Sequence, residues 1–187
     1  MQVEIIIAGF GGQGILFAGQ VLAYAAMDAG KNVTWFPSYG PEMRGGTANC
    51  TVIISDEEIG SPLVRRPRAA IVMNRPSLDK YEPLVQPGGI LVVNASMAGR
   101  AAERTDVEVV ALPANEMAEA LGDRRLANMI MVGALLARLP VLSLEQVEQA
   151  LREHMPGRHR HLIELNIRAL REGALAAQAA VTPAASG

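Results

Sequence analysis

The most constraining feature of this sequence is a glycine-rich turn set between an apolar run and a helical pattern. Residues 3–8 form a short run dense in isoleucine, which is typical of a strand buried on both faces of a parallel sheet. The turn at 9–14 follows, and residues 15–29 then show helical periodicity that ends before Gly30. A strand, a tight turn and a helix in this order are typical of the opening of a doubly wound α/β fold.

The remaining segments alternate between strand-like and helix-like patterns, which favours one Rossmann-like α/β domain with a mostly parallel sheet flanked by helices. We expect this domain to cover residues 1–178 and a flexible tail to cover 179–187. Residues 48–55 alternate polar and apolar side chains, which fits a half-exposed strand, antiparallel at an edge, although strand order stays open. Further strands are predicted at 32–36, 69–73, 90–93 and 107–112, and helices at 77–85, 115–121, 126–139, 143–155 and 158–178.

Composition and charge exclude several classes of function. The net charge is −2 and no face is strongly basic, so nucleic-acid binding is not expected. No apolar stretch reaches the roughly 18 residues of a membrane span, and the N-terminus lacks the cationic start of a signal peptide. The single cysteine, Cys50, can form neither an iron–sulfur cluster nor an internal disulfide, which fits a reducing cytoplasm. Because Cys50 falls in the strand at 48–55, we expect a buried, inert thiol.

The glycine turn has the pattern G-x-G-x-x-G, in which glycines permit a tight turn and close approach of a phosphate to the backbone. The following helix would offer free N–H groups to an anion. A conventional NAD site also needs an acidic residue after the second strand, and Pro37 and Ser38 stand there instead. No Lys-Ser or Lys-Thr pair follows the glycines, so a P-loop is excluded. A tight turn that binds no ligand stays open as the alternative.

A second glycine-rich loop, at 37–46, follows the predicted strand at 32–36. Loops after parallel strands gather at the carboxyl edge of the sheet, so this loop is expected beside the glycine turn. Asn74 and Asn94 each follow another predicted strand and are expected at the same edge. Both asparagines are also typical of side-chain caps on strand-end turns, and Ser38 has the same alternative.

Together, Gly11-Gly12-Gln13-Gly14, the loop from Ser38 to Gly46 and the pair Met73-Asn74 closely resemble the gamma subunit, or gamma domain, of 2-oxoacid:ferredoxin oxidoreductases. The resemblance spans about residues 3–175, nearly the whole chain. Relatives that act on pyruvate tend to have Ala-Pro after the first glycine that follows the loop's arginine. Here Gly45-Gly46-Thr47 follows Arg44, which looks more like the 2-oxoglutarate type or another 2-oxoacid.

The resemblance implies a subunit of a complex that decarboxylates a 2-oxoacid on thiamine diphosphate, joins the acyl group to coenzyme A and reduces ferredoxin. Thiamine diphosphate, magnesium and the iron–sulfur clusters would belong to alpha and beta partner subunits, with a delta (ferredoxin-like) subunit as a further candidate partner. This chain would pack on those subunits and supply a partial coenzyme A site, with no catalytic residue of its own. Self-pairing into a homodimer is also compatible with the isolated chain.

On this basis we predict that two loops and two asparagines contact the cofactor. The turn would cradle a phosphate with Gln13 as an added amide donor, and Arg44 would bind phosphate or carboxylate bidentately. Glu42 would orient Arg44 or pair with a partner subunit, and Tyr39 has the character of an interface anchor. The predicted cofactor-binding residues are Gly9, Gly11, Gly12, Gln13, Gly14, Ser38, Tyr39, Glu42, Arg44, Gly45, Gly46, Asn74 and Asn94.

Two other classes of function stay open from the residues alone. The first is a self-sufficient NAD(P)-dependent oxidoreductase, which the glycine turn favours and the missing acidic residue opposes. The second is a nucleotide-binding interaction module without a catalytic partner. His154, His159 and His161 have a spacing compatible with a metal, but a solvated helix–turn–helix is the simpler interpretation.

Overall fold

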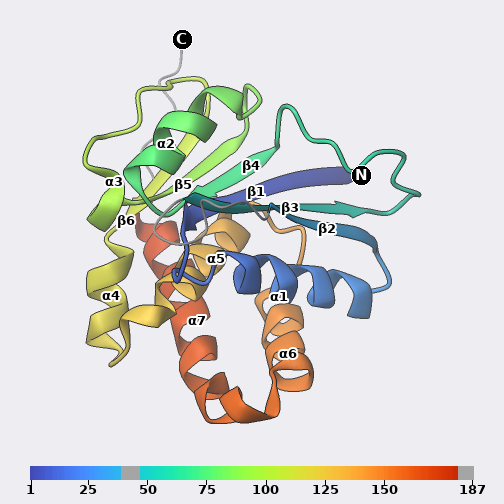
Figure 1. Ribbon diagram of the computed structural model, residues 1–187, viewed down its shortest axis with the longest axis vertical. Coiled ribbons are helices and arrows are strands. Elements are labelled where there is room, and N and C mark those ends of the chain that lie inside the picture. The colour runs from blue at the N-terminus through green and yellow to red at the C-terminus, as the bar shows by residue number, and fades with distance from the viewer. Residues whose placement is uncertain (39–46, 181–187) are drawn as a thin grey trace.

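The computed structural model describes residues 1–38 and 47–180, which form one six-stranded sheet with helices on both faces (Figure 1). The strand order is β2-β3-β1-β4-β5-β6. Strands β1, β4, β5 and β6 are parallel, as expected for a doubly wound α/β fold. The strands are β1 (Gln2–Phe10), β2 (Asn32–Ser38), β3 (Thr47–Ser55), β4 (Ala69–Val72), β5 (Ile90–Asn94) and β6 (Glu108–Leu112).

The position predicted for the strand at 48–55 is only partly right. Strand β3 is antiparallel, as expected, but it lies between β2 and β1 rather than at an edge. Every second residue of its first half is partly exposed, including Asn49 and Thr51, whereas Ala48, Cys50 and Val52 are buried. The alternation of polar and apolar residues in β3 therefore results from one partly exposed face of an interior strand. The edge strand on this side of the sheet is β2.

The helices cover the two faces of the sheet unequally. Helices α1, α5, α6 and α7 pack together on one face over the larger core, whereas α2 and α3 lie on the other face near β4, β5 and β6 (Figure 1). Helix α5 is buried almost all round, which confirms the central position predicted for it. The helices are α1 (Ile15–Asp28), α2 (Arg75–Tyr81), α3 (Ala95–Ala98), α4 (Ala114–Ala120), α5 (Ala127–Arg138), α6 (Leu144–His154) and α7 (Ile163–Ala179), with short 3-10 helices η2 (Glu82–Leu84), η3 (Arg124–Leu126) and η4 (Gly157–Leu162).

Two details of the last helices test the predicted boundaries. Ser143 and Gln146 form the predicted capping box at the start of α6, with reciprocal hydrogen bonds of 3.1 and 2.8 Å. The helix predicted at 158–178 begins later, at Ile163, because the six residues before it form η4. None of those six residues is buried, so this segment has no apolar face packed on the core that would stabilise an α-helix.

Cys50 is buried, and burial raises the pKa of its thiol to about 12. The thiol therefore stays protonated and unreactive, as predicted.

Among residues 1–38 and 47–180, no helix combines the length and the apolar character needed to cross a bilayer. Of the predicted tail, residues 181–187 lie outside the described residues.

Candidate functional site

The candidate site lies at the carboxyl edge of β1, where the glycine turn leads into α1. Strand register places Phe10 opposite Thr47 and Ser38 opposite Asn49, so both residues that flank 39–46 lie at this same edge. The residues on either side of the second glycine-rich segment thus lie at the edge where the sequence predicts that segment, and its contact with the turn stays a prediction. The predicted contacts Tyr39, Glu42, Arg44, Gly45 and Gly46 lie outside the described residues.

Gly9 belongs to β1 rather than to the turn, which corrects the predicted start of the turn. A Cβ on Gly9 would lie 2.6 Å from Gln13 Oε1 and 2.8 Å from Met73 Cβ. Glycine is therefore required there so that the turn can fold back on β4. The turn itself runs from 11 to 14, and Gly12 and Gly14 adopt left-handed φ values of 90° and 72°.

Side-chain hydrogen bonds fix the turn from both sides. Gln13 Oε1 accepts the N–H of Phe10 at 2.7 Å, and Gln13 Nε2 donates to the carbonyl of Met73 at 3.4 Å. From α5, buried Asn128 donates to the carbonyl of Gly14 at 3.1 Å. The amide of Gln13 that the sequence suggested as a ligand donor is thus engaged within the protein. The backbone conformation of the turn is therefore fixed in advance by hydrogen bonds to the end of β4 and to α5.

A cleft of about 390 Å³ opens in front of this turn. Its volume is in the range of small-molecule sites, and its floor is largely apolar. The residues that line it come from the turn, from the ends of β4 and β5, and from the α4–α5 connection: Phe10, Gly11, Gly12, Gln13, Met73, Met97, Asn115, Arg124, Arg125 and Ala127.

Among the described residues, the charged side chains that line this cleft are those of Arg124 and Arg125, and none of the lining side chains is a carboxylate. Their side chains are 64% and 73% exposed. Asp123 orients Arg125 through hydrogen bonds of 2.7 and 3.1 Å, and this guanidinium holds the pKa of Asp123 below its usual range. Arg124 lies 3.7 Å from Glu119, a longer ion pair than that of Arg125 with Asp123. The cleft therefore favours an anion, and both guanidinium groups retain donors for one.

The sequence did not single out Arg124 or Arg125, because they lie more than 100 positions from the turn that they face. The available local signal was the adjacent arginine pair directly before an apolar helix, following Gly122 and Asp123. Asn128 carried no such signal, because an asparagine at a helix start is ordinary in any sequence.

Asn74 and Asn94 act as caps in the structure, the alternative that the sequence left open. Asn74 Oδ1 accepts the N–H of Ser77 at 2.9 Å, and Asn94 Oδ1 accepts the N–H of Ser96 at 3.3 Å. Asn94 Nδ2 also donates to the carbonyl of Met73 at 3.2 Å. Both side chains are buried, so they brace the edge of the sheet, and their contact with a ligand stays a prediction.

The acidic residue that a dinucleotide site needs is absent from the described end of β2. Asp28, which stands near the expected spacing, lies at the last position of α1, opposite the end that bears the turn. It is hydrogen-bonded to His154 of α6 at 2.8 Å, and His154 stacks on Tyr24 with ring centroids 4.2 Å apart. Asp28 and His154 thus join two helices away from the cleft, which disfavours a conventional NAD site.

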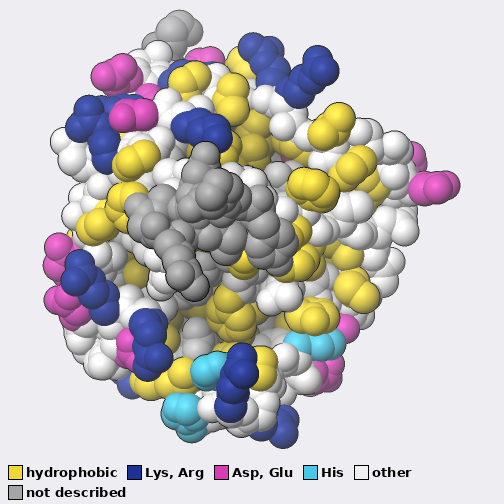
Figure 2. Space-filling model, viewed as in Figure 1, with side chains coloured by type: hydrophobic (Ala, Val, Ile, Leu, Met, Phe, Trp, Pro, Cys, Tyr) yellow, Lys and Arg dark blue, Asp and Glu magenta, His cyan; other side chains and the backbone are white. Residues whose placement is uncertain are grey.

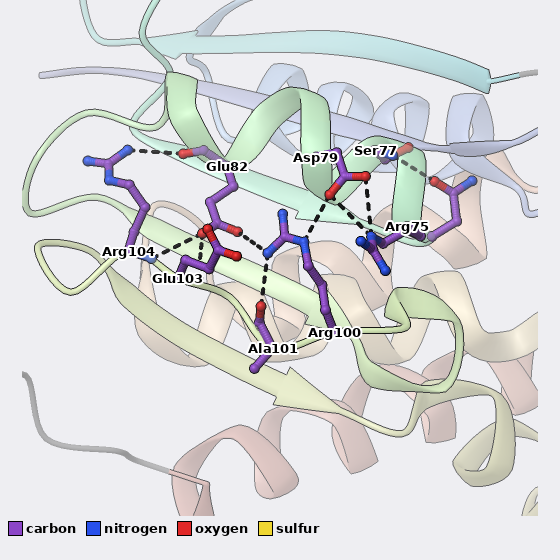
Figure 3. A network of polar contacts seen from close by, with 9 residues as sticks. Arg75, Ser77, Asp79, Glu82, Arg100, Ala101, Glu103 and Arg104 are labelled. Atoms are coloured by element: carbon purple, nitrogen blue, oxygen red, sulfur yellow. Dashed lines mark hydrogen bonds and ion pairs between the residues drawn. The ribbon is translucent and has the colours of Figure 1, made fainter.

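A second polar cluster lies on the α2 side of the sheet (Figure 3). Buried Glu82 accepts the backbone N–H groups of Glu103 and Arg104 at 2.6 and 3.0 Å, and Arg100 Nη1 at 3.1 Å. Arg100 also binds Asp79 at 2.9 Å, so its guanidinium lies between two carboxylates. These contacts hold the segment after α3 against η2, and we assign the cluster a structural role.

Comparisons with known proteins extend over nearly the whole chain. The family model described as pyruvate ferredoxin/flavodoxin oxidoreductase matches residues 4–176. The ketoisovalerate oxidoreductase subunit VorA of Methanothermobacter thermautotrophicus is 41% identical over 177 residues. That match covers 92% of this chain and 36% of VorA, so the chain spans about a third of that relative's length.

Two solved structures share the fold. The gamma subunit of keto/oxoacid ferredoxin oxidoreductase from Geobacter sulfurreducens PCA is 32% identical, with a TM-score of 0.82 over 95% of this chain and 99% of that one. A 2-oxoglutarate:ferredoxin oxidoreductase from Magnetococcus marinus, with 2-oxoglutarate, coenzyme A and succinyl-CoA bound, is 23% identical. Its TM-score is 0.85, and the match covers 98% of this chain and 32% of that chain.

Proposed function

This chain belongs to the pyruvate ferredoxin/flavodoxin oxidoreductase family, and from that premise we propose that it is the gamma-type subunit of a 2-oxoacid:ferredoxin oxidoreductase. The complex would oxidise and decarboxylate a 2-oxoacid such as 2-oxoglutarate, transfer the acyl group to coenzyme A and pass the electrons to ferredoxin. The proposed partners are alpha, beta and delta-type subunits in the cytoplasm. One buried cysteine cannot ligate an iron–sulfur cluster, so the redox centres would belong to those partners.

Within this complex, the cleft in front of the glycine turn would bind the phosphate-bearing end of coenzyme A, whose thiol accepts the acyl group. The observation that carries this proposal is the convergence of Arg124 and Arg125 on the preformed turn, across a cleft to which the described residues contribute no carboxylate. Gly12 supports it, because the position that a Cβ would occupy there has no atom within 4 Å. Backbone N–H groups of the turn are then approachable by a phosphate oxygen.

The residues of this chain would bind and orient the cofactor rather than react with it. The two guanidinium groups would hold phosphate oxygens, and the apolar floor formed by Phe10, Met73 and Met97 would contact the less polar parts. Glu42 and Arg44 remain proposed contacts, because the residues that flank their loop, Ser38 and Thr47, lie at the same edge of the sheet as the turn. Binding of this kind positions the thiol for chemistry on a neighbouring subunit.

The proposal is tested by titrating coenzyme A onto the full chain and onto the assembled complex by calorimetry. We expect the double variant R124Q/R125Q to bind coenzyme A about 10- to 100-fold more weakly, because a hydrogen bond to a charged group contributes about 1.5–3 kcal/mol. The affinity of the unchanged chain should also fall with added salt.

The matched control is R158Q/R160Q, which removes the same charge from the exposed turn η4, away from the cleft. This control should leave the affinity within about twofold of the unchanged chain, because exposed charges at a distance are screened by salt. Equal losses in both double variants would show a general charge effect, and no loss in R124Q/R125Q would exclude the cleft as the cofactor site.

A further inference from the structure

Asn115 is a buried polar side chain of the cleft to which the proposed function assigns no role. It lies in the first turn of α4, is 7% exposed, and lines the cleft together with the glycine turn. Its backbone N–H donates to Ser96 Oγ at 3.1 Å, so the neighbouring helix α3 fixes the position of the residue. A polar side chain buried this deeply needs defined hydrogen-bond partners, and those partners decide which of its atoms a ligand can use.

The amide of Asn94 is oriented by two backbone groups. Asn94 Oδ1 accepts the N–H of Ser96 at 3.3 Å, and Asn94 Nδ2 donates to the carbonyl of Met73 at 3.2 Å. A backbone N–H only donates and a backbone carbonyl only accepts, so the oxygen and the nitrogen of Asn94 cannot be exchanged. Asn94 Nδ2 carries a second hydrogen, and it donates to Asn115 Oδ1 at 3.1 Å.

This hydrogen bond in turn orients the amide of Asn115. Because Asn94 donates, the atom of Asn115 that faces it has to be the acceptor, Oδ1. Asn115 Nδ2 is then the other end of the amide, and it has no hydrogen-bond partner among the residues that the structure describes. The N–H groups of Asn115 Nδ2 are therefore available to a ligand in the cleft that this residue lines.

Asn115 differs in this respect from the other amide in the lining. Gln13 engages both ends of its amide within the protein, whereas Asn115 engages only its oxygen. The cleft thus combines the guanidinium groups of Arg124 and Arg125 with an amide nitrogen that no described residue engages. Figure 2 shows exposed basic side chains over α4 and its connection to α5. Guanidinium groups suit phosphates, whereas a neutral amide N–H suits an uncharged acceptor.

We propose that Asn115 Nδ2 donates a hydrogen bond to an uncharged acceptor of coenzyme A, and that Asn94 is the residue that positions it. The inference rests on the proposed function and deepens it, because it adds a contact that phosphate binding does not supply. Coenzyme A carries two kinds of uncharged acceptor, the ring nitrogens of adenine and the amide carbonyls of pantetheine. A buried donor that needs such an acceptor disfavours ligands that offer phosphate alone.

The test titrates coenzyme A onto the full chain by calorimetry and compares N115L and N115D with the unchanged chain. N115L removes the donor without adding charge, and N115D removes it while keeping an acceptor for Asn94. N115L should bind coenzyme A about 5- to 10-fold more weakly, the loss expected for one hydrogen bond. N115D should lose at least as much, because its carboxylate would also repel phosphates.

The matched control is N166L, which changes an asparagine of α7 that is 6% exposed and does not line the cleft. Asn166 Nδ2 donates to the carbonyl of Leu162 at 2.8 Å, so N166L also removes a buried amide hydrogen bond. This control should leave the coenzyme A affinity within about twofold of the unchanged chain. An equal loss of affinity in N166L and N115L would overturn the inference, because it would show a general effect of stability.

Titration with ADP distinguishes the two acceptors, since ADP carries adenine and a diphosphate but no pantetheine. If Asn115 binds adenine, N115L should weaken the binding of ADP and of coenzyme A by the same factor. If it binds a pantetheine carbonyl, N115L should weaken only coenzyme A. Either result supports the inference, and unaltered affinity for both ligands in N115L and N115D would overturn it.

The positioning role of Asn94 is tested by the kinetics of the assembled complex. N94A should raise the KM for coenzyme A about fivefold and leave kcat at saturating coenzyme A unchanged, because Asn94 acts on binding. N94A/N115L should raise this KM no more than N115L does, since both changes remove the same contact. A fall in kcat with an unchanged KM would limit Asn94 to a structural role and overturn this part of the inference.

Melting curves of the same variants separate loss of affinity from loss of folding. N115D keeps the hydrogen bond with Asn94 and should melt closer to the unchanged chain than N115L does. If R124Q/R125Q weakened coenzyme A binding while N115L and N115D did not, the inference would fall and the proposed function would stand. If the unchanged chain and the assembled complex bound no coenzyme A, both would fall.

Discussion

The carbonyl of Met73 shows why single residues of this site resisted prediction. It accepts hydrogen bonds from Gln13 and from Asn94, so it joins the glycine turn to the neighbouring strands β4 and β5. The motif correctly predicted a tight turn between β1 and α1, because φ preference is a local property, but it placed Gly9 in that turn instead of in β1. The engagement of Gln13 within the protein could not be predicted, because it depends on a backbone carbonyl 60 positions away.

At the same scale, Gly14 combines two separate requirements. Its φ of 72° disfavours any side chain, and a Cβ there would also overlap Asn128 Nδ2. Gly30 shares the first requirement, with a φ of 76°, but has no atom within 4 Å of the Cβ position.

We therefore predict that Gly14→Ala lowers the free energy of unfolding more than Gly30→Ala does. Gly30→Ala should cost about 1–2 kcal/mol for the left-handed backbone, and Gly14→Ala at least about 1 kcal/mol more for the overlap. Urea unfolding followed by circular dichroism measures both. Equal costs would mean that Asn128 moves aside freely and does not fix the turn.

Among the elements, α5 and α7 illustrate what periodicity predicts and what it misses. The apolar run predicted α5 as a central helix, and the amphipathic pattern predicted most of α7. Their crossing depends on Gly133 and Gly173, because a Cβ on either would overlap a backbone carbonyl of the other helix, that of Leu170 or of Ile130. This contact could not be predicted from the sequence, because the two glycines lie in different helices. A single glycine within a helix does not indicate which other helix approaches it.

This crossing yields a prediction about packing. Gly133→Ala or Gly173→Ala should destabilise the protein by about 1–3 kcal/mol or more, because the helices have to move apart and lose contacts in the core. Gly157→Ala serves as the control, since its Cβ position is open and its φ is not in the left-handed region. Thermal unfolding of the three variants measures the difference. A stability loss no larger than that of Gly157→Ala would show that the close approach is dispensable.

At the scale of the whole molecule, the order of strands and helices predicted the α/β class, and the structure and the family match confirm it. The insertion of β3 between β2 and β1 was not predictable, because alternation shows that one face is exposed but not which strands are neighbours. That insertion has a functional consequence. It returns the chain to the edge where the turn lies, with Thr47 paired to Phe10 and Ser38 paired to Asn49.

We propose that this chain completes a cofactor site for redox chemistry carried out by its partners. The most direct measurement is the rate of ferredoxin reduction by a 2-oxoacid and coenzyme A, in an anaerobic reconstitution with and without this chain. We predict that neither this chain alone nor the partner subunits alone reduce ferredoxin, and that mixing them restores turnover. Full turnover by the partner subunits in the absence of this chain, or turnover by this chain alone, would contradict the account.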